Sequence, residues 1–141
     1  MYDRVLVPTD RSHGTEGAVE HAFDLAVTHS AALHALNVVE TNLGVDASMS
    51  GTLGALEEAG QTAVDEVIQR AKATGVETVT GVVTEGIPHQ AILEYVDEHN
   101  VDVVVMGTHG RTGLDRYLLG SVTEKVVRLS DVPVLTVPMS T

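Results

Sequence analysis

Four residues have the types and spacing of an anion-binding loop: Gly107, Gly110, Gly120 and Ser121. They follow an apolar run at 101–106, with two residues between the first two glycines and nine between Gly110 and Gly120. Glycine lets backbone N–H groups approach an anion, and a helix N-terminus adds unpaired donors and a partial positive charge. Spaced glycines also occur where a chain merely turns, so the spacing alone carries little weight. With a strand before it and a helix after it, the loop predicts a phosphate site.

The expected phosphate donors are backbone N–H groups of the loop and the helix start, in Gly110 to Gly113, Gly120, Ser121, Val122 and Thr123. Ser121 also opens a Ser-x-x-Glu sequence with Glu124, a capping-box pattern that would stabilise the helix by about 1 kcal/mol. The two roles are compatible, because a serine at a helix start can also donate its hydroxyl to phosphate. Arg111 is either a mobile cation for the phosphate or a solvated loop arginine. His109 could contact phosphate, whereas a general-base role lacks a second acid or base in the same segment.

Five apolar, β-branched stretches alternate with four longer segments of helical character, which is the pattern of an α/β fold. Strands are expected at 4–7, 35–39, 78–84, 103–106 and 134–137. Helices are expected around 18–26, 53–71, 91–96 and 122–129, where apolar residues recur at near-helical spacing. Pro88 suits the first turn of the third helix, and Gly75 suits the end of the second.

This alternation predicts right-handed crossovers and one open, doubly wound, Rossmann-like parallel sheet with helices on both faces. Several of the strands are apolar throughout, as burial on both faces requires. The chain shows no internal repeat and no domain boundary, so we expect one domain over residues 1–141. The irregular stretch Thr41 to Gly51 could form a mobile lid over a ligand or a long solvated connection.

A second polar turn, Pro8-Thr9-Asp10, follows the first expected strand. Ligands of open α/β sheets bind beyond the carboxyl ends of strands, at the point where the strand order reverses. The polar turns after the first and fourth strands therefore suggest that these strands are neighbours. The Asp10 carboxylate could accept hydrogen bonds from ribose hydroxyls, hold a divalent cation through water, or cap the following helix. Val38, at the end of the second strand, could contact an adenine ring or belong to the core.

The net charge of -12 arises from 20 acidic residues against 8 lysines and arginines. This balance argues against binding nucleic acid or anionic lipid through a broad basic face. It is typical of a salt-rich cytosol, where a Debye length of roughly 3 Å or less limits repulsion, or of an ordinary acidic mesophile protein. The sequence contains no cysteine, no apolar run long enough to span a membrane and no signal peptide. We therefore expect a cytoplasmic protein without a membrane partner.

Signatures of several enzyme classes are absent from the sequence. It has no Gly-x-x-x-x-Gly-Lys-Ser/Thr loop, so it lacks the lysine that stabilises a transferring phosphoryl group. It also has no Gly-x-Ser-x-Gly elbow and no cysteine nucleophile. Weak or no hydrolysis is therefore expected, and binding is better supported than turnover. The alternatives are a slow ATPase or phosphotransfer enzyme that uses Asp10 or His109, and a non-catalytic protein that binds AMP or another anion.

The stretch from Val105-Met106-Gly107-Thr108-His109-Gly110 through Gly120-Ser121-Val122-Thr123-Glu124 resembles the ATP-binding branch of the universal stress protein family. The resemblance covers essentially the whole chain, from Val5-Leu6-Val7-Pro8-Thr9-Asp10 to Ser130-Asp131-Val132-Pro133-Val134-Leu135-Thr136-Val137. Family members that carry the Gly-x-x-Gly, nine-residue, Gly-Ser/Thr motif bind ATP, and this chain has every position of the motif. Its acidic surface differs from that of many relatives but lies outside the motif.

The resemblance implies the strand order 3-2-1-4-5, and a nucleotide-dependent switch or effector in the stress response that acts on an unidentified protein partner. We expect ATP as the ligand, with Mg²⁺ or Mn²⁺. The motif and the resemblance together predict the nucleotide-binding residues Pro8, Thr9, Asp10, Val38, Met106, Gly107, His109, Gly110, Arg111, Gly113, Gly120, Ser121, Val122 and Thr123. The family also implies a homodimer through antiparallel pairing of Val134–Val137. This strand is short, apolar and uncharged, and would be an exposed edge unless the C-terminal tail covers it.

Overall fold

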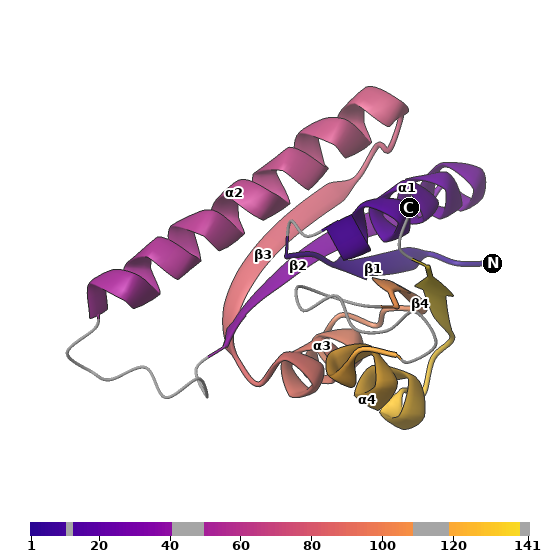
Figure 1. Cartoon of the computed structure of the whole chain (residues 1–141). Helices are drawn as coiled ribbons and strands as arrows, with labels where there is room; N and C mark the ends of the chain where they lie inside the picture. The colour runs from indigo at the N-terminus through magenta and orange to yellow at the C-terminus, as the bar shows by residue number, and fades with distance from the viewer. Residues whose placement is uncertain (11–12, 41–49, 109–118, 139–141) are drawn as a thin grey trace.

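The computed structural model describes residues 1–10, 13–40, 50–108 and 119–138. Strands and helices alternate along these residues, as the sequence predicts (Figure 1). In chain order the elements are β1 (Arg4–Pro8), α1 (His13–His29), β2 (Ala32–Glu40), α2 (Ser50–Thr74), β3 (Val79–Gly86), α3 (Pro88–Glu98), β4 (Val103–Gly107), α4 (Ser121–Leu129) and β5 (Val134–Val137).

Two boundaries differ from the sequence prediction in ways that matter for the site. β2 begins three residues earlier than expected, at Ala32, because its first residues pair with the start of β1 through Arg4↔Ala32 and Val5↔Leu33. The stretch predicted to be irregular up to Gly51 ends sooner, since α2 begins at Ser50. The lid expectation therefore falls on 41–49, outside the described residues.

The five strands form one parallel sheet in the order β3-β2-β1-β4-β5, which confirms the predicted topology. β1 lies at the centre and pairs with β2 on one side and with β4 on the other. After β3 the chain crosses to the other side of β1 to form β4 and then β5. The strand order therefore reverses between β1 and β4, and the carboxyl ends of these two strands meet at one edge of the sheet.

Helices cover both faces of the sheet, α1 and α2 on one and α3 and α4 on the other (Figure 1). Side chains of β1 alternate between the two layers: Val5 and Val7 pack with α1 and α2, and Leu6 packs with α3 and α4. Burial on both faces explains why these strands are apolar throughout. Leu6, Leu33 and Leu36 are fully buried, and each such side chain stabilises the fold by about 1.5–3 kcal/mol.

The structure confirms both residues that the sequence placed at helix ends, Gly75 and Pro88. Gly75 ends α2 with a positive φ of 109°, and its N–H donates to the carbonyls of Ala71 and Lys72. A left-handed residue at this position is a common helix C-terminus and favours glycine. Pro88 occupies the first turn of α3, where its missing N–H removes no helix hydrogen bond.

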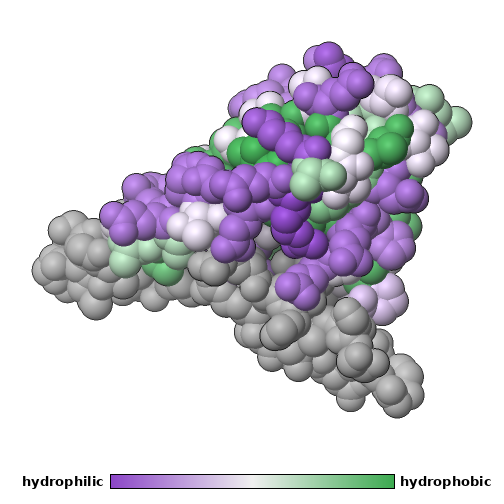
Figure 2. Space-filling model, turned by 90° about the horizontal axis from the view of Figure 1, so that it is seen from above, coloured by the Kyte–Doolittle hydropathy of each residue, from purple (hydrophilic) through white to green (hydrophobic). Residues whose placement is uncertain are grey.

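One face of the molecule carries many hydrophilic residues. Figure 2, which views the molecule from above Figure 1, shows hydrophilic residues over much of the described surface, as the net charge of -12 leads one to expect. Within the described ranges, the helices include none that is both long and apolar enough to cross a bilayer.

Candidate functional site

The carboxyl ends of β1 and β4 lie side by side, where the sequence places its two polar turns. The strands pair through Val5↔Val103 and Leu6↔Val104, which confirms that the first and fourth strands are neighbours. Thr9 and Asp10 continue the chain beyond β1; Thr9 is only 7% exposed and Asp10 is half-buried. This edge is the reversal point at which open α/β sheets bind their ligands.

The start of α4 is held against the end of β4 by two hydrogen bonds. The Gly120 N–H donates to the Thr108 carbonyl at 2.7 Å, and the Thr123 hydroxyl donates to the Gly107 carbonyl at 2.8 Å. Thr123 is buried, with 4% of its surface exposed, so its hydroxyl bond is shielded from water. The N-terminus of α4 therefore lies at the carboxyl end of β4, as an anion site at this point requires.

The identity of the N-cap residue of α4 shows what Ser121 does at the start of the helix. The N-cap is Gly120, with φ -60° and ψ 152°, and no side chain caps the helix there. In a capping box the serine itself must be the N-cap. Ser121 is instead the first helical residue and is exposed, so the capping-box interpretation of Ser121 and Glu124 is wrong.

This start leaves backbone donors at the helix N-terminus. The Glu124 N–H donates to the Gly120 carbonyl at 2.9 Å, which is the first hydrogen bond of the helix. The N–H groups of Ser121, Val122 and Thr123 come before it, and such groups have no acceptor within their own helix. They are the donors on which the phosphate prediction depends, and the helix dipole adds a partial positive charge beside them.

The predicted site residues on the strands differ in what they can offer a ligand. Met106 is 6% exposed and packs in the core under α3 and α4, so its side chain is structural. Val38 is half-buried beside the same core, two residues before the end of β2 rather than at its end as predicted. The last residue of β1, Pro8, pairs with Leu36 of β2. Val38 therefore still lies past the carboxyl end of β1, on the side of the sheet where the ligand is expected.

Four of the predicted residues, His109, Gly110, Arg111 and Gly113, lie outside the described residues.

Asn37 is a residue of this edge that sequence reasoning did not single out. It is 8% exposed, and its side-chain amide donates to the Thr9 carbonyl at 2.8 Å. The Thr9 N–H in turn donates to the Leu36 carbonyl at 2.8 Å, so both backbone groups of Thr9 are bound to β2. The signal in the sequence was one amide side chain within an otherwise apolar stretch of strand.

Asn37 also explains a glycine within α2. A Cβ atom on Gly60 would overlap Asn37 Oδ1 and would lie 3.0 Å from Asn37 Cγ. Only a residue without a side chain lets α2 pack this close to the strand. Asn37 thus joins the end of β1, the strand β2 and the helix α2 in one buried contact.

These features define a class of protein: a doubly wound α/β fold with a helix N-terminus held at the switch point of its sheet. Comparison with protein families narrows the class. The model of the universal stress protein family matches residues 1–138. The chain belongs to the universal stress protein family.

Known relatives agree with this assignment over most of their length. Universal stress protein MJ0531 of Methanocaldococcus jannaschii is 38% identical over 141 residues, covering 97% of this chain and 82% of that protein. Universal stress protein MJ0577 of the same organism is 32% identical over 155 residues, covering 97% and 95%. A solved structure of MJ0577 superposes with a TM-score of 0.91 at 30% identity, covering 100% of this chain and 99% of that one.

A further solved structure, of a universal stress protein in complex with cAMP, has a TM-score of 0.74 and 29% identity. The match covers 99% of this chain and 98% of that chain.

Proposed function

We propose that the protein binds ATP at the carboxyl ends of β1 and β4 and acts in the cytosol as a nucleotide-dependent switch or effector in the stress response. The observation that carries the proposal is the N-terminus of α4, which the Gly120 and Thr123 hydrogen bonds hold at the carboxyl end of β4. The related structure in complex with cAMP supports a nucleotide as the ligand class. The complete glycine motif favours ATP over a nucleotide with one phosphate.

In this proposal each group has a defined role. Phosphate oxygens accept from the N–H groups of Ser121, Val122 and Thr123, with further donors in the segment from His109 to Gly113. Asp10 accepts from ribose hydroxyls or holds Mg²⁺ or Mn²⁺ through water, and Val38 contacts the adenine ring. The ligand would add negative charge and a base at the edge formed by β1, β4 and α4. A protein effector could distinguish that surface from the ligand-free one.

Isothermal titration of the full chain with ATP, ADP and AMP in the presence of Mg²⁺ tests the proposal. We expect ATP to bind at least about tenfold more tightly than AMP, because each added phosphate accepts further charge-assisted hydrogen bonds. Equal, millimolar-weak affinity for ATP and AMP would remove the triphosphate argument and favour a site for AMP or another anion.

Phosphate release measured on the same protein separates a binding protein from a slow ATPase. We expect the wild type, Asp10→Ala and His109→Ala all to release phosphate at one background rate. A faster wild-type rate that falls in either variant would establish the enzyme alternative instead.

We also propose a homodimer formed by antiparallel pairing of β5 with its copy. Within the described part of the chain, β5 pairs only with β4, so its outer edge has unpaired backbone groups. Leu135 of β5 is 39% exposed, and Val127 and Leu129 of the adjoining α4 are 43% and 48% exposed. An apolar edge strand beside apolar helix residues favours pairing with another strand.

A further inference from the structure

The outer edge of β3 has unpaired backbone groups. Within the described part of the chain β3 pairs only with β2, and this edge has eight residues against four in β5. The Leu33 N–H donates to the Thr78 carbonyl at 2.9 Å, and Leu33 pairs with the next residue of β3. The N–H and C=O of one residue in a parallel strand point to the same side, and successive residues alternate. The backbone groups that point away from β2 are therefore those of Val79, Gly81, Val83 and Glu85.

The side chains of β3 lie on two faces of the sheet. Val83 packs with the layer of α1 and α2, and Val82 packs with the layer of α3 and α4. Side chains alternate along a strand, so Glu85 shares the α2 face with Val83. α2 lies close over this face, since a Cβ atom on Gly81 would lie 2.7 Å from Ile68 Cδ1. A segment that adds to this edge would thus place alternate side chains beside α2 and beside α3.

Two carboxylates meet on the α2 face of this edge. Glu57 of α2 and Glu85 of β3 are both exposed. A hydrogen bond with the Glu85 side chain raises the pKa of Glu57 above its ordinary 4.5, and partial desolvation and repulsion between the two carboxylates raise it further. No lysine or arginine within the described ranges forms an ion pair with either of them. A cationic side chain placed beside the pair would replace this repulsion with attraction.

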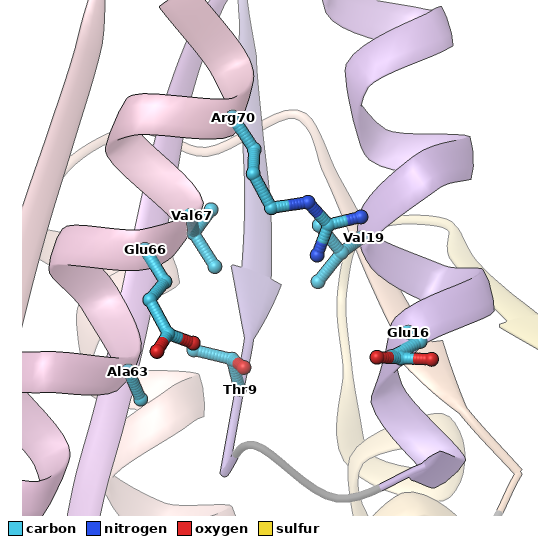
Figure 3. Close-up of a pocket in the computed structure, with 7 residues that line it drawn as sticks. All are labelled: Thr9, Glu16, Val19, Ala63, Glu66, Val67 and Arg70. Carbon is cyan, nitrogen blue, oxygen red and sulfur yellow. The ribbon is translucent and has the colours of Figure 1, made fainter.

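The basic residues of α2 lie away from this pair. Figure 3 shows that Arg70 extends towards α1, where its guanidinium lies 4.0 Å from the Glu20 carboxylate. Lys72 is in the last turn of α2. Both are about 20 Å or more from Glu57 along the helix axis, at a rise of about 1.5 Å per residue. The acidic pair at the edge of β3 therefore lacks a cation from its own helix.

We propose that the outer edge of β3 is a docking site for an extended basic segment of a partner protein, which adds to the sheet as a further strand. The backbone of the segment pairs with that of Gly81 and Val83. Its lysine or arginine side chains face α2 and bind Glu57 and Glu85, and its apolar side chains lie beside Val82 on the α3 face. None of these residues belongs to the set predicted to bind ATP.

A second copy of this chain fits the edge less well than a basic partner does. An antiparallel pair of β3 strands centred on Gly81 would bring each Glu85 opposite Glu77 of the other copy. Like charges directly opposite one another destabilise a strand pair. The net charge of -12 also repels a second copy and attracts a basic segment. Charge complementarity therefore favours the basic partner.

Titration of the ¹⁵N-labelled full chain, without ATP, with a capped peptide of about seven residues that alternates lysine and valine tests this proposal. We expect saturable shifts of the Gly81 and Val83 amides, and hydrogen exchange at both slowed about tenfold or more, because they gain carbonyl acceptors. The amides of Val82 and Thr84 face β2 and should change much less. The same peptide with every backbone nitrogen methylated keeps its charges but cannot donate strand hydrogen bonds, so it should bind at least about tenfold more weakly.

Glu57→Gln and Glu85→Gln should each weaken binding of the lysine–valine peptide about threefold at low ionic strength, because each removes one surface charge pair. Asp24→Asn is the matched control, since it also removes one exposed carboxylate but lies on α1, and it should bind the peptide like the wild type. All three side chains are exposed, so loss of folding does not confuse the result.

Unchanged exchange at Gly81 and Val83 in the presence of saturating peptide would overturn the proposal. Equally tight binding of the methylated peptide, or equal weakening by Asp24→Asn, would also overturn it, because either result would reduce the binding to a general attraction between opposite charges. The titration contains no ATP, so this proposal and the proposed nucleotide site can fail separately.

Discussion

At the scale of single residues, buried polar contacts shape the edge of the sheet. Asn37 binds the Thr9 carbonyl, and Thr123 binds the Gly107 carbonyl, so the chain is held where it leaves each of the two central strands. Thr9 lies just beyond β1 and Gly107 is the last residue of β4, and a buried carbonyl without a hydrogen bond would be costly. The two side chains supply these donors and thereby hold the ends of β1 and β4 in place.

The sequence predicted some of these residues and not their roles. Thr123 was expected through its backbone N–H, whereas the structure also uses its hydroxyl as a tie to β4. Ser121 and Glu124 matched a capping box, but Gly120 is the N-cap, because a sequence pattern does not reveal which residue has the extended backbone angles. Asn37 could not be assigned a partner, since the register that places it beside Thr9 is set by tertiary structure.

The Thr123 hydroxyl can be tested without changing the shape of the side chain. Thr123→Val leaves the Gly107 carbonyl buried without its donor, so we expect the free energy of unfolding to fall by about 1–3 kcal/mol. Urea denaturation measures this change. Ser121→Ala, two positions away on an exposed side chain, should change stability by less than about 0.5 kcal/mol. Equal stability of Thr123→Val and the wild type would contradict the role of this hydrogen bond.

The lowered pKa of His34 leads us to expect that the stability of the fold depends on pH. Burial lowers its pKa below the ordinary 6.5, and the charges of His99 and Arg4 lower it further. Its Nδ1 and the Tyr95 hydroxyl share a hydrogen bond of 2.6 Å. The unfolded chain therefore takes up a proton on His34 at a higher pH than the folded chain does. The stability that His34 contributes is present above pH 6.5 and is lost as the pH falls from there to its folded pKa.

Urea denaturation between about pH 8 and pH 5 checks this dependence. His34→Gln removes the titration, so its stability profile should be flatter than that of the wild type below pH 6.5. His21→Gln is the control, because His21 is exposed and its ring shares a hydrogen bond with the Gly17 carbonyl of its own helix. Parallel stability profiles for His34→Gln and the wild type would show that burial of His34 does not determine how stability changes with pH.

At the scale of elements, periodicity and glycine placement account for most of what the sequence could predict. All five strands and all four helices of the described chain were expected, and Gly75 and Pro88 mark helix ends as their backbone chemistry requires. The boundaries were less predictable. The extra residues of β2 are strand because β1 and β3 pair with them, which is a tertiary effect that local propensity does not contain.

The packing of α2 against the sheet depends on a glycine whose role the sequence did not show. Alanine in place of glycine within a helix normally stabilises it by about 1 kcal/mol. At Gly60 we expect the opposite, a loss of about 1–3 kcal/mol, because the added methyl group would overlap the Asn37 side chain. Gly54 lies in the same helix, and a Cβ there would meet nothing within 4 Å.

Thermal or urea denaturation of Gly60→Ala and Gly54→Ala therefore compares a packed and an open position of one helix. Gly54→Ala should match or exceed the wild-type stability. Because Asn37 also holds Thr9 at the proposed nucleotide site, Gly60→Ala should in addition weaken ATP binding. A Gly60→Ala protein as stable as Gly54→Ala would mean that α2 does not depend on this close approach.

At the scale of the whole molecule, the sheet order follows from the family resemblance more than from local pattern. Alternating strands and helices indicate a parallel sheet, yet several strand orders satisfy that pattern. The two polar turns reduced the choice by suggesting that the first and fourth strands are neighbours, and the structure confirms it. The partner surface at β5 stays a prediction.

A charged residue in the middle of β5 tests the proposed dimer. Leu135→Lys places a charge in the middle of the β5 edge, where it should disfavour pairing with a second copy. Light scattering coupled to size exclusion should give the mass of a dimer for the wild type and that of a monomer for the variant. Val27→Lys is the control, because Val27 is similarly exposed, at 45%, but lies on α1. A wild-type protein with the mass of a monomer would contradict the proposed dimer.

The central claim is that the backbone amides at the start of α4 bind the phosphates of ATP. Titration of the ¹⁵N-labelled chain with ATP and with AMP, read at the amides of Ser121, Val122 and Thr123, tests it most directly. The account predicts saturable shifts of these amides with ATP, larger than those with AMP, while the amide of Gly75, at the other end of α2, is unchanged. Saturable ATP binding that leaves these three amides unshifted would contradict it.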